Sequence, residues 1–195
     1  MTLGGVRLSP QQRRLWTLQE GDGQGAPAYV AACALSLDGP VDTSALEAAC
    51  ADLAARHEIL RTCFRRLPGV TVPLQFVQET ARVGLEEVDL TGRTNLEIDC
   101  RVEQLLQQGV IPADLESGPL LRATSIVLER DRRMLVIHLP ALCTDAAGLR
   151  IIARDFLRLY EARVGGGEGL GHVAQYADLS QWINDILGAE ETEAG

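Results

Sequence analysis

The sequence predicts an α/β (α+β) fold in which helices pack against a mixed β-sheet. Three capping boxes, in which Ser or Thr is followed three residues later by Gln or Glu, predict helices that begin near Ser9, Ser44 and Thr94. Short apolar or alternating stretches lie between them. Two of these, residues 120–129 and 134–139, flank the charged turn Arg130-Asp131-Arg132 and predict a hairpin. The 195 residues suit one domain that is large enough to bury a core.

Composition excludes several classes of protein. The net charge of −9 and the absence of a long basic run argue against a nucleic-acid surface. No stretch reaches the roughly 18 apolar residues that a membrane helix needs, and residues 1–9 lack the apolar centre of a signal peptide. The cysteines are scattered without metal-type spacing, which predicts buried thiols and a cytoplasmic location; they are Cys33, Cys50, Cys63, Cys100 and Cys143.

The first half of the chain is expected to alternate helices with strands. The helix from Ser9 should run through Trp16 to about Gln19, where glycines end it. Residues 28–37 carry small or apolar side chains on both faces, which predicts a strand inside a sheet. After the helix from Ser44, residues 62–66 and 72–78 predict a hairpin across Pro68-Gly69. Residues 85–90 form another short alternating segment.

The second half is expected to hold three more helices. The helix from Thr94 should end at Gly109, and another should run from Asp145 to about Arg163, with Thr144 as a suitable cap. Five glycines in residues 164–171 predict a flexible connection. In a last helix over residues 175–187 we expect one packed face and one exposed face: Tyr176, Leu179, Trp182 and Ile183 inward, and Gln181, Asn184 and Asp185 outward. An acidic tail follows over residues 189–195.

The stretch from Met134 to Gly148 predicts a buried strand, a tight turn and a helix start, a common setting for a site. It resembles the core motif of the condensation domains of nonribosomal peptide synthetases, in which two histidines, three residues, aspartate and glycine follow a strand. Asp145 matches the aspartate, whereas Pro140 and Ala141 replace the histidines and Ala146 replaces the glycine. His138 lies three residues too early, on the opposite strand face from Ala141.

Four further segments resemble motifs of the same family, in the correct order. They are Leu8-Ser9-Pro10-Gln11-Gln12-Arg13-Arg14-Leu15-Trp16, Arg56-His57-Glu58-Ile59-Leu60-Arg61-Thr62-Cys63-Phe64, Asp114-Leu115-Glu116-Ser117-Gly118-Pro119-Leu120-Leu121-Arg122-Ala123 and Tyr176-Ala177-Asp178-Leu179-Ser180-Gln181-Trp182. The resemblance implies a fold like that of chloramphenicol acetyltransferase, with two lobes around a tunnel. Residues 1–188 resemble the N-terminal lobe, and the acidic tail then lies at the lobe boundary. The implied partners are acyl or peptidyl carrier domains, whose phosphopantetheine arms are tethered substrates, together with a second lobe and adjacent synthetase domains. No directly bound cofactor or metal is implied.

The resemblance also implies roles for individual residues. The family's aspartate pairs with an arginine of the second motif, so Asp145 is expected to bind Arg61. Arg56 and Trp182 are expected to be structural, with Trp182 in core or interface packing, and His57 to pack at a helix end. His138 is expected to make a local hydrogen bond in its strand; the alternatives are a catalytic histidine or a base for the thiol of Cys143.

The core motif lacks the second histidine, which the family uses in peptide-bond formation. Heterocyclising relatives use two aspartates there, but Pro140 replaces the first. There is no nucleophile elbow such as G-x-S-x-G and no phosphate loop. Three hypotheses remain: a non-catalytic or remodelled domain that positions carrier-tethered groups, an acyltransferase that forms amides by positioning when its second lobe completes it, and a scaffold for neighbouring domains.

Overall fold

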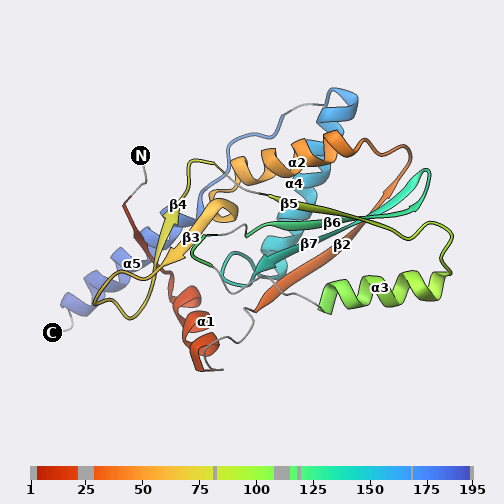
Figure 1. Cartoon of the computed structure of the whole chain (residues 1–195). Coiled ribbons are helices and arrows are strands. Elements are labelled where there is room, and N and C mark those ends of the chain that lie inside the picture. The colour runs from red at the N-terminus through yellow and green to blue at the C-terminus, as the bar shows by residue number, and fades with distance from the viewer. Residues whose placement is uncertain are drawn as a thin grey trace.

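A four-stranded mixed sheet forms the centre of the fold (Figure 1). The computed structural model describes residues 4–21, 29–80, 83–107, 115–117, 120–167 and 169–193, with side chains up to residue 188. The strand order is β2-β7-β6-β5, where β2 is Val30–Asp38, β5 Gly84–Asp89, β6 Arg122–Glu129 and β7 Arg132–Pro140. β7 is antiparallel to both neighbours, whereas β5 is parallel to β6. The predicted mixed sheet and the hairpin of β6 and β7 are confirmed.

β2 lies at an edge of this sheet, so the prediction that it lies inside a sheet was wrong. It pairs with β7 along its whole length, from Val30 opposite Pro140 to Asp38 opposite Arg132. Its small and apolar residues cover both faces because α4 (Ala146–Gly165) contacts it from one side and α3 (Asn95–Gln107) from the other, rather than because it has two strand neighbours. The predicted start at Ala28 lies outside the described residues.

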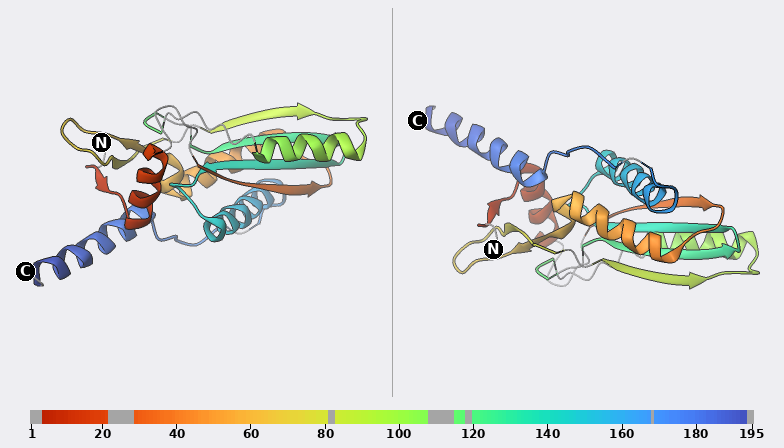
Figure 2. Two further views of the ribbon diagram at one scale, coloured as in Figure 1. Left: turned by 90° about the horizontal axis from the view of Figure 1, so that it is seen from below. Right: turned by 90° about the horizontal axis from the view of Figure 1, so that it is seen from above.

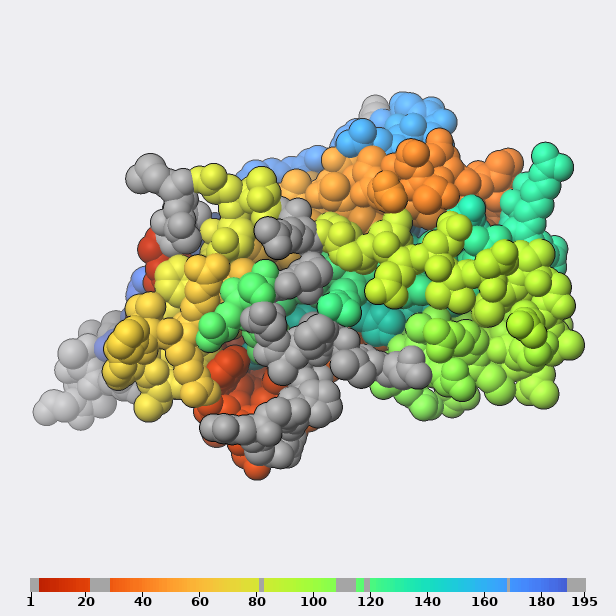
Figure 3. Space-filling model, in the orientation of Figure 1, coloured from red at the N-terminus to blue at the C-terminus, as the bar shows by residue number. Residues whose placement is uncertain are grey.

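Helices cover both faces of the large sheet (Figure 2). α2 (Thr43–Arg56) and α4 (Ala146–Gly165) pack together on one face, and α3 (Asn95–Gln107) lies on the other. In the space-filling view, α3 and the hairpin over residues 62–77 lie at opposite ends of the molecule (Figure 3). None of the helices in the described part of the chain is long and apolar enough to cross a bilayer.

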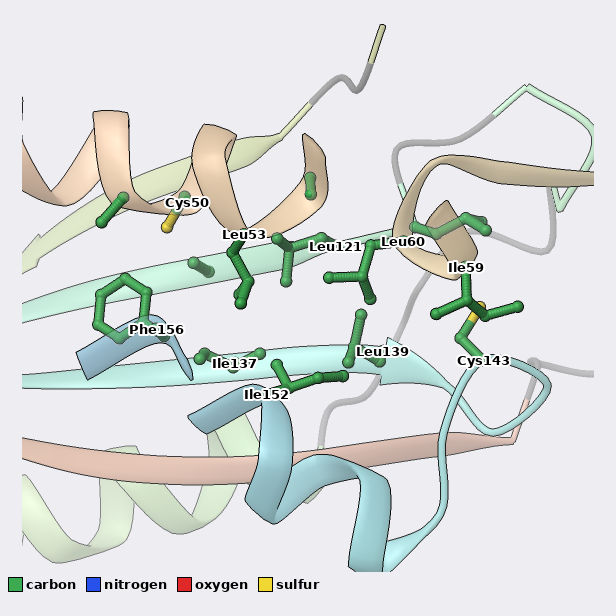
Figure 4. Close-up of a cluster of buried hydrophobic side chains, with 14 of the residues drawn as sticks. Cys50, Leu53, Ile59, Leu60, Leu121, Ile137, Leu139, Cys143, Ile152 and Phe156 are labelled. Atoms are coloured by element: carbon green, nitrogen blue, oxygen red, sulfur yellow. The ribbon is translucent and has the colours of Figure 1, made fainter. Parts of the chain in front are cut away.

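The main core lies between the sheet and the helices α2 and α4 (Figure 4). Alternation along β7 directs Leu135, Ile137 and Leu139 into this core, while Val136 belongs to a smaller cluster beneath α3. Phe156 of α4 is fully buried. A shift of β7 by one residue would therefore exchange the side chains that face the main core with those that face α3.

A smaller sheet lies at one end of the molecule. Its order is β1-β4-β3, with β1 Val6–Arg7, β3 Thr62–Arg65 and β4 Leu74–Val77, and the 3₁₀ helix η1 (Glu58–Arg61) precedes β3. The antiparallel pairing of β3 with β4 confirms the predicted hairpin. α1 (Pro10–Gly21) and α5 (Tyr176–Glu193) lie beside this sheet, and α5 projects away from the body (Figures 1 and 2).

Two of the three predicted capping boxes are confirmed. Ser9 and Gln12 exchange hydrogen bonds at the start of α1, and Thr94 and Glu97 do so before α3. α2 differs, because Asp42 rather than Ser44 is the cap and accepts from the Ala45 N–H at 3.0 Å. The reason is that Asp42 precedes the helix while Ser44 lies within its first turn.

The C-terminal elements extend beyond their predicted ends. α4 continues through the first predicted connection residues to Gly165, and Gly166 ends it with φ of 71°, which favours glycine. α5 continues to Glu193, so the residues expected as a frayed tail are helical up to that point. The predicted helix end at Gly109 and the segments at Asp114 and Gly118–Pro119 lie outside the described residues.

Candidate functional site

The motif loop, residues 141–145, connects β7 to the start of α4. The Ala141 N–H donates to the Tyr29 carbonyl at 2.7 Å, and the Cys143 N–H donates to the Pro140 carbonyl at 2.8 Å. The second bond closes a tight turn, whereas the first continues the pairing of β2 with β7, and Ala141 is half-buried. The side chain at Ala141 is a methyl group, which cannot transfer a proton.

Asp145 caps α4. Its Oδ1 accepts from the backbone N–H of Gly148 at 2.8 Å and of Ala147 at 3.0 Å. These hydrogen bonds, led by that from Gly148, hold the pKa of the exposed carboxyl below its usual value. Asp145 rather than Thr144 is the cap, and it precedes the helix instead of lying in its first turn.

The predicted pairing of Asp145 with Arg61 is not made. The guanidinium of Arg61 binds Glu58 at 3.0 Å and also donates to the carbonyl of Gln78. Arg61 is thus held by its own 3₁₀ helix and by the residue that follows β4, while the carboxylate of Asp145 accepts from N–H groups of α4. Each charged side chain is bound by its own nearby partners, so the long-range pair is absent.

Arg56 instead binds Asp155, a carboxylate that is only 1% exposed. Arg56 Nε and His57 Nε2 each lie 3.0 Å from Asp155 Oδ2, and Arg154 binds the other oxygen. Burial raises the pKa of Asp155, but these hydrogen bonds outweigh it and hold the pKa below its usual value. Burial lowers the pKa of His57 despite the neighbouring carboxylate. This cluster joins the end of α2 to α4.

His138 and Cys143 do not form a thiol–base pair. His138 Nε2 lies 2.7 Å from the carbonyl oxygen of Leu105 in α3. This contact lies on the opposite side of the sheet from the main core. Cys143 is buried in that core, and burial raises the pKa of its thiol. A neutral thiol without a base is a poor nucleophile.

A pocket of about 390 Å³ lies against the motif loop. α1, the loop and α5 all contribute to its wall: Gln11, Gln12, Leu15, Ala141, Leu142, Cys143, Thr144, Asp145, Gly148, Tyr176, Leu179 and Ile183. No histidine is among these lining residues. Their one carboxylate, Asp145, is ionised and committed to capping, so the described wall supplies shape and apolar surface rather than a general base.

Sequence reasoning missed the role of Gln12 in supporting this pocket. Beyond its capping bond, Gln12 Nε2 donates to the Leu142 carbonyl at 3.0 Å and to Gln75 Oε1 at 3.1 Å. Tyr176 and Ser9 share a hydrogen bond of 2.8 Å nearby. The capping box was the signal that Gln12 matters, but it does not indicate a partner 130 residues away.

α5 also departs from its predicted faces. Trp182 is 61% exposed and Leu179 is exposed too, whereas Asn184 is buried. The Nδ2 of Asn184 donates to the Leu8 carbonyl at 3.0 Å, and the hydroxyl of Ser180 donates to the Arg7 carbonyl at 2.8 Å. Polar residues face inward here because they bind the backbone of the segment before α1.

The condensation-domain family model matches residues 3–194. The chain belongs to the condensation-domain family. Similar curated relatives of this condensation domain include tyrocidine synthase 3 of Brevibacillus parabrevis, 30% identical over 94% of the chain, and the isonitrile lipopeptide synthase of Mycobacterium tuberculosis, 32% identical over 94%. The chain spans 3% and 7% of the lengths of these relatives.

Solved structures place the condensation domain in the chloramphenicol acetyltransferase-like fold, as predicted. SgcC5 from Streptomyces globisporus matches with a TM-score of 0.81 and 30% identity, over 93% of this chain and 42% of that one. The X-domain from teicoplanin biosynthesis, solved in complex with OxyB, matches with a TM-score of 0.80 and 28% identity, over 98% of this chain and 40% of that one. The predicted family and its link to nonribosomal peptide synthesis are therefore confirmed.

Proposed function

We propose that residues 1–188 are the N-terminal lobe of a condensation-type domain that positions carrier-tethered acyl or peptidyl groups without supplying a general base. The observation that carries this proposal is the described wall of the pocket, which has no histidine and presents a methyl group at Ala141 beside the start of α4. Substrates tethered to phosphopantetheine arms would approach this wall. Residues 189–195 then lie at the lobe boundary.

An apolar stripe on α5 supports a second lobe as a partner. Leu179, Trp182 and Ile186 are exposed at helical spacing, with exposed fractions of 45%, 61% and 41%. Such a stripe is typical of a surface that another part of the protein covers. Trp182→Ser should lower the melting temperature of the two-lobed parent and leave that of this chain unchanged. Gln181→Ser, on the same turn, is the matched control; equal effects of Trp182→Ser on both proteins would contradict the assignment.

The proposal is tested with the two-lobed parent protein and two loaded carriers, one acyl and one aminoacyl. Both carriers are expected to bind in calorimetric titrations, while mass spectrometry of the carriers detects no condensed product above the uncatalysed level. This chain alone should also give none. Condensed product would favour the amide-forming acyltransferase, which positioning alone could drive. Loss of that product in Cys143→Ala would restore the thiol hypothesis.

A scaffold function is the second candidate, favoured by the X-domain structure, in which a domain with the same fold is bound to OxyB. A defined non-carrier protein that binds the two-lobed parent while neither carrier binds would support it. The five free thiols support the proposed cytoplasmic location.

A further inference from the structure

Most polar side chains that line the motif pocket are already bonded to the protein itself. Both ends of the Gln12 side-chain amide bind other parts of the chain. The hydroxyl of Thr144 donates to the carbonyl of Asp145 at 3.1 Å, and the Asp145 carboxylate accepts from α4. Gln11 is exposed to solvent. In the described wall, the hydroxyl of Tyr176 is therefore the half-buried polar group whose hydrogen remains to be assigned.

The direction of the hydrogen bond between Tyr176 and Ser9 follows from the burial of Ser9. The two hydroxyl oxygens lie 2.8 Å apart. Ser9 is 1% exposed, and its Oγ also accepts from the backbone N–H of Gln12 at 3.2 Å. Among the residues that the structure describes, Tyr176 is the one partner that can accept the Ser9 hydrogen. Because a buried donor without an acceptor is destabilising, Ser9 donates and Tyr176 accepts.

This direction leaves the hydrogen of the Tyr176 hydroxyl free, since a phenol can accept one hydrogen bond while it donates another. Tyr176 lines the pocket, so its hydrogen is available to a molecule held there. The side chain is also fixed in place. Ser9 holds its hydroxyl, and the preceding residue, Gln175, accepts from the Glu58 N–H at 3.0 Å and donates to the Arg56 carbonyl at 3.1 Å. The donor is thus preorganised.

We propose that the Tyr176 hydroxyl donates a hydrogen bond to the carbonyl oxygen of an acyl thioester held in the motif pocket. Leu15, Leu179 and Ile183 supply apolar surface for the carbon chain of the acyl group. The pocket volume of about 390 Å³ lies in the range of small-molecule sites, about 300–1,000 Å³. The hydrogen bond fixes the orientation of the carbonyl and needs no general base. This inference rests on the proposed function, because the acyl group is the one that a carrier presents.

The test measures binding to the complete chain by NMR amide shifts, with two probes that differ at one group. They are the octanoyl thioester of N-acetylcysteamine and S-octyl-N-acetylcysteamine, in which a methylene replaces the carbonyl. The thioester should bind about fivefold more tightly, which corresponds to one neutral hydrogen bond. Tyr176→Phe should abolish this preference and leave binding of the thioether unchanged. Tyr160→Phe is the matched control and should keep the preference, because the Tyr160 hydroxyl serves the Asp42 N–H instead.

Ser9→Ala tests the direction of the shared hydrogen bond. The preference for the thioester should persist, because Tyr176 already has its hydrogen free, while the melting temperature falls with the loss of the helix cap. A preference that appears in Ser9→Ala but not in the parent would show that Tyr176 donates to Ser9. That result would overturn the proposal.

Two further results would also overturn it: equal or absent binding of the two probes by the parent, and a preference that survives in Tyr176→Phe. Carrier binding to the two-lobed parent is measured separately, so the two proposals can fail independently. If carriers bind but Tyr176→Phe keeps the preference, the assignment of Tyr176 fails and the positioning function stands. If the preference depends on Tyr176 but no carrier binds, the hydrogen bond stands and the positioning of carrier-tethered groups fails.

Discussion

The side-chain amide of Gln12 lies 3.0 Å from the carbonyl oxygen of Leu142 and so connects α1 directly to the motif loop. Gln12 is 2% exposed, and the same amide group reaches Gln75. Gln12→Leu keeps the bulk of the side chain but leaves buried polar groups unpaired. We expect the free energy of unfolding in urea to fall by about 2–4 kcal/mol. Gln11→Leu, on the exposed side of the same turn, is the control and should change it by less than about 0.5 kcal/mol. Equal effects would contradict the assignment.

Asp145→Ala should remove a helix cap and no more. We expect a loss of about 1 kcal/mol in the free energy of unfolding, and Asp145→Asn should recover most of it. A double-mutant cycle with Arg61→Ala should give a coupling energy near zero, because the two side chains bind different partners. A coupling above about 1 kcal/mol would restore the ion pair that the family resemblance implied.

Asp155→Asn should be far more destabilising than the loss of a surface carboxylate. It leaves the guanidinium of Arg56, whose side chain is 17% exposed, without its buried counterion. Removing one partner of a buried pair costs about 3–5 kcal/mol. Asp52→Asn breaks the exposed pair with Arg163 and should cost about 0.5 kcal/mol. The two urea titrations are compared at pH 7.5, and similar losses would argue against a structural cluster.

Stability should decline as the pH falls below about 6.5, the pKa of histidine in an unfolded chain. Burial holds the folded-state pKa of His57 lower than this, so the unfolded state binds more protons between the two values. The contribution is complete above pH 6.5 and is lost as the pH falls through the folded-state pKa. His57→Gln should flatten this part of the profile while leaving the acid transition of Asp155 at lower pH. An unchanged profile in His57→Gln would assign the dependence to another group.

Ala141→His in the two-lobed parent should give little condensation activity. A general base contributes 10²–10⁴-fold only when it is held within reach of the proton. Here Pro140 and Ala146 also differ from the motif, so the side chain would lack the support that fixes its rotamer. Carrier mass spectrometry checks this, with Ala147→His on the exposed first turn of α4 as control. A hundredfold rise in product would show that only the base had been lost.

Features set by neighbouring residues could be predicted from the sequence. The capping boxes at Ser9 and Thr94 and the hairpin of β6 and β7 depend on residues a few positions apart, and the structure has them. The position of β2 could not be predicted, because apolar residues on both faces are equally compatible with helices covering a sheet edge.

Site features that depend on distant partners could not be predicted either. Asn184 was assigned to the solvent because it is polar, yet it is buried against the Leu8 carbonyl. The pairing of Asp145 with Arg61 was carried over from the family. The sequence alone does not show that each side chain binds other partners instead. The absence of a histidine at Ala141 was evident from the sequence, and the structure adds the pocket that Ala141 lines.

The central position of β7 also has a kinetic consequence. Its pairing with β6 closes a two-residue turn, which is a local event, whereas its pairing with β2 joins segments about 100 residues apart and must overcome a larger loop-closure entropy. During synthesis β2 leaves the ribosome long before β7 exists. The Val30–Asp38 segment, whose charge is confined to its last residue, therefore remains unpaired while the residues between β2 and β7 are translated. The refolding chain should acquire the hairpin first and protect the amides of β2 from hydrogen exchange last.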